Sequence, residues 1–305
     1  MFVRREERYI FMEIKQLEIF VRIAKNLSFS KTAQELYVSQ PTVSAHISAL
    51  EKALGCGLFI RSTKEVSLTK TGVDFLAYAK KILALRDQAI LSAGAEDRNM
   101  RGAIDIISST IPAQFLLPEI IASFQKQWPN IVFRVEQADS QRVEREMSSF
   151  RYDFGMVGTI PGNDRFNCNP IFDDELVLAM PNGISRDSRD IRENFADFVR
   201  QTPFISREVG SGTRKEIEAL FSKIGVDMCE LHIPAYFSDT HSILLAISHG
   251  IGVSLISKVS AKLYADAGLL KIVEMNDPLF RRQIYLLHNK ELWMSPRPLL
   301  FLKLS

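Results

Sequence analysis

A chain of 305 residues is longer than most single domains, so its length predicts two domains. Its composition, 46% hydrophobic and 24% charged, is typical of a soluble protein with ample core material. A net charge of +2 does not indicate a polyanionic partner for the chain as a whole, and no run reaches the roughly 18 to 20 apolar residues that span a bilayer.

The first eleven residues, MFVRREERYIF, are basic but lack the apolar core and the small-residue cleavage site of a signal peptide. Met12 directly precedes a helical pattern, so residues 1–11 are predicted to be an extension or an upstream start that the cell does not use. Residues 1–65 carry ten Lys and Arg against seven Asp and Glu, which favours a polyanionic partner at this end of the chain.

The three cysteines are too few and too far apart for a disulfide framework or a zinc site, and they fit a reducing cytoplasm. We expect Cys56, Cys168 and Cys229 to be small buried residues.

The N-terminal elements predict helix, helix, turn, helix and wing. Residues 14–25 have the apolar spacing of a helix, and Ser30 is expected to N-cap the short helix that follows. After a turn at YVS, Ser39 caps a third helix, in which Pro41 occupies the first turn, where its missing N–H has no helical partner to lose. Residues 58–69, LFIRSTKEVSLT, predict a small hairpin.

The third helix has an outer face of small and polar residues. Its apolar stripe, from Val43 through Ile47 to Leu54, should face its own domain. Small side chains let a helix backbone approach the DNA major groove, while hydroxyl and amide groups suit base edges and phosphates. Basic residues in the second helix and in the wing could hold flanking phosphates. The predicted DNA-binding residues are Lys31, Gln40, Pro41, Thr42, Ser44, Ala45, Ser48, Arg61 and Lys64.

A long helix is predicted from Thr69 to about Asp97. Two apolar rows repeat every seven residues along it, and a sustained heptad seam on a lone helix indicates a partner helix. We therefore expect a dimerising linker, with packing on its own chain as the alternative. The two rows are Phe75, Ile82 and Ala89, and Leu76, Leu83 and Ile90.

Beyond Arg101 strands and helices alternate, which predicts right-handed βαβ units and a parallel sheet. The pattern suggests two α/β lobes, with a strand at residues 281–289 returning to the first, and a cleft between them. The expected strands are 103–108, 131–137, 152–158, 175–180, 203–208, 235–239, 251–257 and 281–289, and the expected helices 112–128, 140–150, 213–225 and 240–250.

Three polar segments at strand ends should meet at this cleft, and Asp239 and Thr240 open another helix near the same edge. Helix N-termini offer free N–H groups beside hydroxyls, which suits an anion. The predicted effector-binding residues are Ser108, Ser109, Thr110, Gly158, Thr159, Ser211, Gly212 and Thr213.

Other functions find less support. GSGTRK lacks the GK[ST] order of a P-loop, the scattered histidines show no metal-ligand spacing, and no GxSxG nucleophile elbow is present. We therefore expect no catalytic residue, metal or cofactor. A solute-binding or enzyme-like two-lobed α/β protein with an appended DNA-binding module stays the alternative.

Residues 16–72 resemble the N-terminal domain of LysR-type transcriptional regulators, through SFSKTAQEL, SQPTVSAHI, LE..LG..LF.R and LT.TG in order. His46 stands where glutamine is common in the family, and Lys64 where arginine is common. The resemblance implies an all-α winged helix-turn-helix with a long linker helix, then a two-lobed α/β effector domain like a periplasmic binding protein. It divides the chain into the extension 1–11, a DNA-binding domain 12–69, a linker 70–98 and an effector domain 99–305, with lobe I at about 99–170 and 276–305 and lobe II at about 171–275.

In function, the resemblance implies a cytoplasmic homodimer or homotetramer that binds double-stranded promoter DNA and contacts RNA polymerase. A small-molecule effector, here closest to a small anion or a sulfur-type metabolite, would bias the assembly between geometries. Chain length counted from Met12 is typical of the family.

Overall fold

The computed structural model describes residues 11–61, 65–92, 101–162, 164–290 and 301. Residues 1–10 of the predicted extension, Lys64 of the wing and the predicted linker end at 93–98 lie outside these ranges. The chain divides into two compact units, one built mainly from residues 1–100 and the other from residues 101–148 and 152–289.

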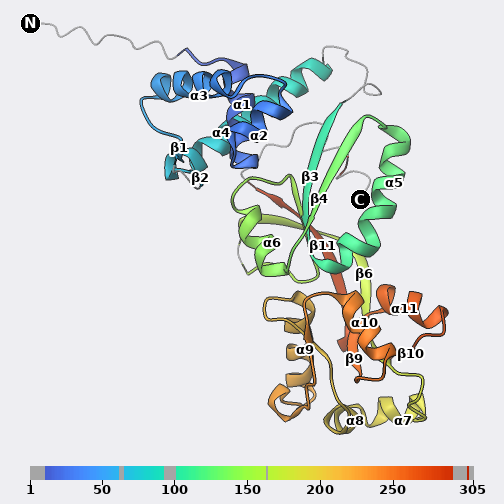
Figure 1. Ribbon diagram of the computed structural model, residues 1–305. Helices are drawn as coiled ribbons and strands as arrows, with labels where there is room; N and C mark the ends of the chain where they lie inside the picture. The colour runs from blue at the N-terminus through green and yellow to red at the C-terminus, as the bar shows by residue number, and fades with distance from the viewer. Residues whose placement is uncertain (1–10, 62–64, 93–100, 163, 291–300, 302–305) are drawn as a thin grey trace, which may run out of the picture. The chain divides into compact units, whose positions relative to one another are not determined.

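The first unit has the predicted order of helices and wing (Figure 1). The N-cap of its second helix differs from the prediction: Ser28, not Ser30, accepts the Lys31 N–H at 3.2 Å. The helix starts earlier because Phe29 is buried in the core and becomes its first residue. Ser30 instead donates from its hydroxyl to Gln40 at 2.8 Å. The elements are α1 (Ile14–Asn26), α2 (Phe29–Glu35), α3 (Gln40–Leu54), β1 (Phe59–Arg61), β2 (Val66–Leu68) and α4 (Lys70–Ser92).

The heptad rows of α4 divide into two groups. Phe75, Leu76, Ile82 and Leu83 pack against the core of the first unit, so the alternative of packing on the same chain holds for these four. Ile90 lies further along the helix and remains 54% exposed.

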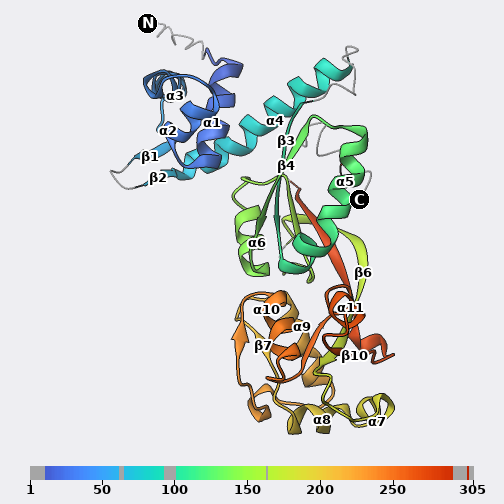
Figure 2. The ribbon, with the colours of Figure 1, turned by 45° about the vertical axis from the view of Figure 1, so that its right-hand side comes forward.

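The second unit is built on one mixed sheet, in the order β10-β6-β11-β5-β3-β4, and β9 also pairs with β6. Figure 2 shows β3 and β4 in one lobe and β6 running from that lobe towards β10 in the other. The parallel prediction is confirmed for β3, β4 and β5, and it is wrong for β6, β9 and β11, which pair antiparallel. The reason is that β6 leaves one lobe for the other and β11 returns beside it. Strand β10, which was not predicted, also pairs antiparallel. The strands are β3 (Gly102–Ser108), β4 (Ile131–Gln137), β5 (Phe154–Val157), β6 (Phe166–Met180), β9 (Ser254–Ser257), β10 (Lys271–Val273) and β11 (Arg281–Asn289), with β7 (Ser206–Arg207) and β8 (Tyr236–Phe237) as a separate parallel pair.

Helices cover this sheet on each lobe. The helix predicted at 112–128 begins as a π-type turn, η2, because Pro118 has no N–H to donate to the preceding turn. Three helices, α7, α8 and α11, were not predicted, because they are only six, seven and nine residues long, although Phe195, Phe198 and Val199 give α8 a helical apolar spacing. The helices are η2 (Pro112–Leu116), α5 (Leu117–Gln127), α6 (Ser140–Met147), α7 (Ser188–Glu193), α8 (Phe195–Gln201), α9 (Gly212–Lys223), α10 (Thr240–Ser248) and α11 (Lys258–Asp266), with short 3-10 turns η3 (Met228–Glu230) and η4 (Pro278–Phe280).

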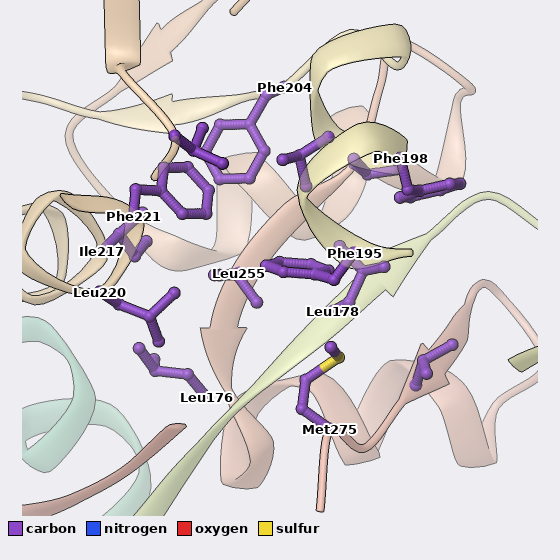
Figure 3. Close-up of a cluster of buried hydrophobic side chains, with 14 of the residues drawn as sticks. Leu176, Leu178, Phe195, Phe198, Phe204, Ile217, Leu220, Phe221, Leu255 and Met275 are labelled. Carbon is purple, nitrogen blue, oxygen red and sulfur yellow. The ribbon is translucent and has the colours of Figure 1, made fainter. Parts of the chain in front are cut away.

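Strand β6 supplies both apolar faces of lobe II. Leu176 and Leu178 point into one cluster with Phe221 of α9 (Figure 3), while Val177 and Ala179 point into another beneath α10. A strand buried on both faces reads as a continuous apolar run, as ELVLAM does. Each fully buried large apolar side chain contributes about 1.5–3 kcal/mol.

The two crossing strands carry a β-bulge at the junction of the lobes. Ile284 of β11 pairs with Phe172, but the next residue, Tyr285, pairs with Pro170, so Ile171 is left without a partner in the ladder. On the lobe II side of the bulge, Arg282 lies directly opposite Asp174.

Candidate functional site

The outer face of α3 is free of the domain core. Val43, Ile47 and Leu50 are fully buried on the inner side. Ser39 caps the helix by accepting the Thr42 N–H at 3.3 Å. Of the predicted DNA-binding residues on α3, Gln40, Pro41, Thr42, Ala45 and Ser48 are exposed, and Ser44 is half-buried.

Arg61 of the wing is tied to α3 and is not directed away from it. Its guanidinium donates to the Ser44 hydroxyl and to the Glu51 carboxylate, both at 3.3 Å, and lies 4.6 Å from the centre of the Phe29 ring. Glu51 also accepts the N–H groups of Leu58 and Phe59, so this network fixes the wing against α3. Lys31 is exposed at the start of α2.

A cavity lies between the lobes of the second unit. Three helices begin at its wall: α6, α9 and the helix that starts at Thr110 and continues into η2. Its walls include Ser109, Thr110, Gly158, Ser211, Gly212 and Thr213 of the predicted effector set. Two predicted residues are not part of the wall. Ser108 is buried beneath it and donates its hydroxyl to the Ser109 carbonyl, and Thr159 does not line the cavity.

The N-termini of α6 and α9 approach each other across this cavity. Asp139 caps α6 by accepting the Arg142 N–H at 2.8 Å, and Ser211 caps α9 by accepting the Arg214 N–H at 3.4 Å. A Cβ on Gly212 would lie 2.6 Å from the Ser140 hydroxyl oxygen, so a side chain at this position would have to displace that hydroxyl. The first N–H groups of each helix have no acceptor within the helix, so both ends direct positive potential at the cavity.

Two arginines outside the predicted set complete the wall. The first, Arg207 of β7, is buried, and its guanidinium is held in a fork by the Glu208 carboxylate at 2.8 and 2.9 Å. It also donates to Ser238 O at 3.0 Å and to the hydroxyl oxygens of Thr240 and Thr110 at 3.4 Å. Because Thr110 belongs to lobe I and Arg207 to lobe II, this last bond links the two lobes.

The second is Arg282 of β11, whose side chain is 5% exposed. Its Nε donates to Asp174 at 2.8 Å, and its Nη1 donates to Glu216 at 2.7 Å and to the Thr213 hydroxyl at 3.1 Å. Asp174 also accepts the Ser257 hydroxyl at 2.7 Å. Among the described residues, Nη2 of Arg282 is buried without a hydrogen-bond partner.

Burial sets the protonation behaviour of this group. Loss of hydration raises the pKa of Glu216 above its ordinary 4.5, and the attraction of Arg282 opposes this without cancelling it. Burial alone would lower the pKa of Arg282, but Glu216 and Asp174 together raise it, so the guanidinium stays charged.

The cavity is small, with a volume of about 20 Å³. One water molecule needs about 10–15 Å³ on this scale, so the closed cleft has room for a few atoms and not for a ring. A compact polar group therefore fits this geometry best.

Signals for the missed residues were present in the sequence. Arg207 lies in residues 206–214, SREVGSGTR, the same segment that contains the predicted effector-binding residues Ser211, Gly212 and Thr213. Arg282 lies in a strand predicted to cross between lobes, and a charged residue within a buried strand indicates a paired or ligand-binding group. Asp139 and Ser140, which also line the cavity, form the polar start of a predicted helix.

The histidines, cysteines and acidic residues in the described ranges do not form a metal site. No cluster of three or more His, Cys, Asp or Glu residues that could hold a metal occurs in the ranges that the structure covers. His241 is hydrogen-bonded to the Tyr264 hydroxyl, and His249 ends α10. Cys229 is exposed and Cys56 and Cys168 are half-buried, so the expectation of buried cysteines is wrong, since all three lie outside the core clusters proper. No helix in the described part of the chain has the length and apolar character to cross a membrane.

Known proteins similar to this chain share both units. Residues 14–73 match the family described as bacterial regulatory helix-turn-helix protein, lysR family, and residues 97–304 match the LysR substrate binding domain. An uncharacterized HTH-type transcriptional regulator of Methanocaldococcus jannaschii, MJ0300, is 34% identical over 278 residues, covering 91% of this chain and 93% of that protein.

Solved structures with the same fold include a full-length OxyR variant from Pseudomonas aeruginosa, with a TM-score of 0.73 at 18% identity over 96% of each chain. The effector binding domain of QuiR in complex with shikimate has a TM-score of 0.58 at 21% identity, covering 67% of this chain and 95% of that one. The two matched domains account for both units described above, and the chain belongs to the LysR family of transcriptional regulators, DNA-binding proteins whose action is modulated by a small-molecule effector.

Proposed function

We propose that this regulator binds promoter DNA through the outer face of α3 and that a small anion in the inter-lobe cleft controls it. The observation that carries the proposal is the meeting of the α6 and α9 N-termini, with Arg207 and Arg282, around one compact cavity. Helix N-termini and guanidinium groups are the donors that proteins use for carboxylate, sulfate and phosphate groups.

On the DNA side, the exposed residues of α3 read base edges and the N–H groups at its start hold a phosphate. Lys31 and Lys64 contact flanking phosphates. Arg61 acts both at the DNA backbone and as the brace that sets the wing against Ser44 and Glu51.

The signal passes from the cleft to the DNA through assembly. Leu85 and Ile90, two of the exposed apolar residues of α4, form the contact between two linker helices in a homodimer, which can pair again into a tetramer. An anion that binds one lobe arrangement more tightly shifts the population of assembly geometries. The shift changes how the assembly contacts promoter DNA and RNA polymerase in the cytoplasm. No chemical step is needed.

Thermal unfolding of the full chain against inorganic anions, sulfur metabolites and small carboxylates tests this proposal. A ligand at about 100 times its Kd adds about 2.7 kcal/mol of stability. We expect a selective hit that is weakened by Thr110→Ala and by Ser211→Ala and is unchanged by Ser222→Ala, an exposed position on the same helix α9. Stabilisation that survives both cleft substitutions would contradict the site.

A further inference from the structure

Three charged side chains from three elements meet at the floor of the inter-lobe cleft. Arg282 of β11 lies between Asp174 of β6 and Glu216 of α9, at N···O distances of 2.8 and 2.7 Å. Arg282 itself lines the cavity. The floor therefore connects the ligand site to the strands that cross between the lobes.

This cluster has more carboxyl groups than guanidinium groups. One arginine faces two acids, so the cluster carries a net negative charge when both acids are ionised. Such an excess charge is costly where water is excluded, and it opposes the entry of an anion. The same cavity nevertheless has Nη2 of Arg282 buried with no acceptor among the described residues. A buried guanidinium N–H without an acceptor among these residues is a donor that faces the cavity and is available to a ligand.

The surroundings of Glu216 make it the acid that can change its charge. The groups that face it are Arg282 and Asp174, together with Tyr285 on β11, whose pKa is raised by burial and further by the negative charge of Glu216. Each carboxylate oxygen of Asp174 accepts one hydrogen bond, from Arg282 or from the Ser257 hydroxyl, whereas Glu216 accepts from Arg282 alone among the bonds described. Burial favours the neutral form of Glu216, and a neutral acid can still accept the Arg282 N–H through its carbonyl oxygen.

We propose that an anion entering the cleft accepts a hydrogen bond from Nη2 of Arg282 and brings with it one proton, taken from solvent by the Glu216 carboxylate. The proton neutralises Glu216, and the anion replaces its charge beside Arg282. The proton thus offsets one unit of the charge that the anion brings into the buried cluster. This inference rests on the proposed anion-binding function of the cleft and adds proton uptake to it.

Coupling of this kind makes affinity depend on pH. Where free Glu216 is ionised and bound Glu216 is protonated, each unit rise in pH weakens anion binding by up to about tenfold. With the carboxyl replaced by an amide, which keeps the acceptor for Arg282 but cannot titrate, the dependence should disappear.

Titration calorimetry of the full chain with sulfate, and separately with oxalate, tests the proposal between about pH 5.5 and about pH 8. Both probes keep their charge over this range, so any proton taken up is taken up by the protein. Buffers of different ionisation enthalpy report the number of protons directly. The wild type should take up as much as one proton per anion, and Glu216→Gln none, with an affinity that no longer changes with pH. Glu218→Gln is the matched control, because Glu218 lies on the same helix and pairs with Arg214 near the surface.

The outcomes separate this inference from the function on which it rests. Binding without proton uptake in the wild type overturns the inference and leaves the anion site standing. Uptake that persists in Glu216→Gln assigns the proton to another group and overturns the role of Glu216. Absence of binding by either anion at every pH overturns both, provided that thermal unfolding shows each variant to be folded.

Discussion

Gly212 at the start of α9 and Ser140 at the start of α6 belong to different lobes, and a Cβ on Gly212 would lie 2.6 Å from the Ser140 Oγ. The absence of a side chain on Gly212 lets the two helix ends approach this closely without displacing the Ser140 hydroxyl. Closure and anion binding should therefore both depend on Gly212.

Gly212→Ala is expected to keep the fold and to weaken sulfate binding about tenfold or more, because the methyl group holds the lobes apart at a cost of about 1–3 kcal/mol. Calorimetric Kd values check this. Ser140→Ala in the same chain removes the clashing oxygen and should restore much of the affinity, and Gly183→Ala, where a Cβ meets nothing within 4 Å, is the control. Equal affinity in Gly212→Ala and wild type would show that the ligand does not need a closed cleft.

Glu216→Gln should change how stability depends on pH. The folded-state pKa of Glu216 is raised, so its contribution to stability is fully present below its ordinary pKa of 4.5 and is lost as pH rises through the folded-state value. Over that window the wild type should lose stability relative to Glu216→Gln by at most about 1.4 kcal/mol per pH unit. Urea unfolding of both proteins from about pH 4 to about pH 8 measures the difference, and parallel curves would contradict burial of the ionised acid.

Ser44→Arg should weaken binding to the operator by about 1–3 kcal/mol, since a bulky side chain blocks the approach of α3 to base edges. Binding to random DNA should change little or tighten with the added charge. Gln127→Arg adds the same charge at an exposed position on α5 of the second unit and is the control. Fluorescence anisotropy on operator and random duplexes measures both, and equal losses on the two would move Ser44 away from the bases.

Lys31→Ala should weaken operator and random DNA alike, and it should reduce the salt slope of binding by about one unit if Lys31 contacts a phosphate. Lys15→Ala, at an exposed position on α1, should leave the slope unchanged. A slope unaltered in Lys31→Ala would remove this residue from the interface.

Self-association should be sensitive to the exposed apolar residues of α4 and not to the whole heptad seam. Leu85→Glu and Ile90→Glu, at positions 50% and 54% exposed, should shift sedimentation towards monomer while the melting temperature stays near that of wild type. Leu83→Glu is unsuitable for this test because Leu83 packs against the core of its own unit, and a charge at this position would destabilise that unit. Thr71→Glu, exposed in the first turn of α4, serves as the control, and unchanged assembly in the Leu85 and Ile90 variants would place the contact elsewhere.

Local rules predicted much of this molecule. Ser39 and Pro41 mark the start of α3 because capping and a missing N–H act within one turn, and ELVLAM predicts a buried strand because its apolar run is continuous. The antiparallel course of β6 and β11 could not be predicted in this way, since it depends on which lobe each strand joins. The same holds for Arg282: its partners are 66 and 108 residues away in sequence, and only the assembled sheet brings them to the cleft.

The bulge at Ile171 has a consequence for how chains of this fold can vary in length. Side chains alternate between the two faces of the sheet along β6, and this strand runs through both lobes. The alternation is interrupted at one position, Ile171, which has no partner on β11. Deleting Asp173, which lies beyond the bulge, would turn Asp174 away from Arg282 and exchange the burial sites of Leu176 and Val177. Homologous chains should therefore gain and lose single residues in their loops, whereas β6 can change only by two residues at a time or by moving the bulge.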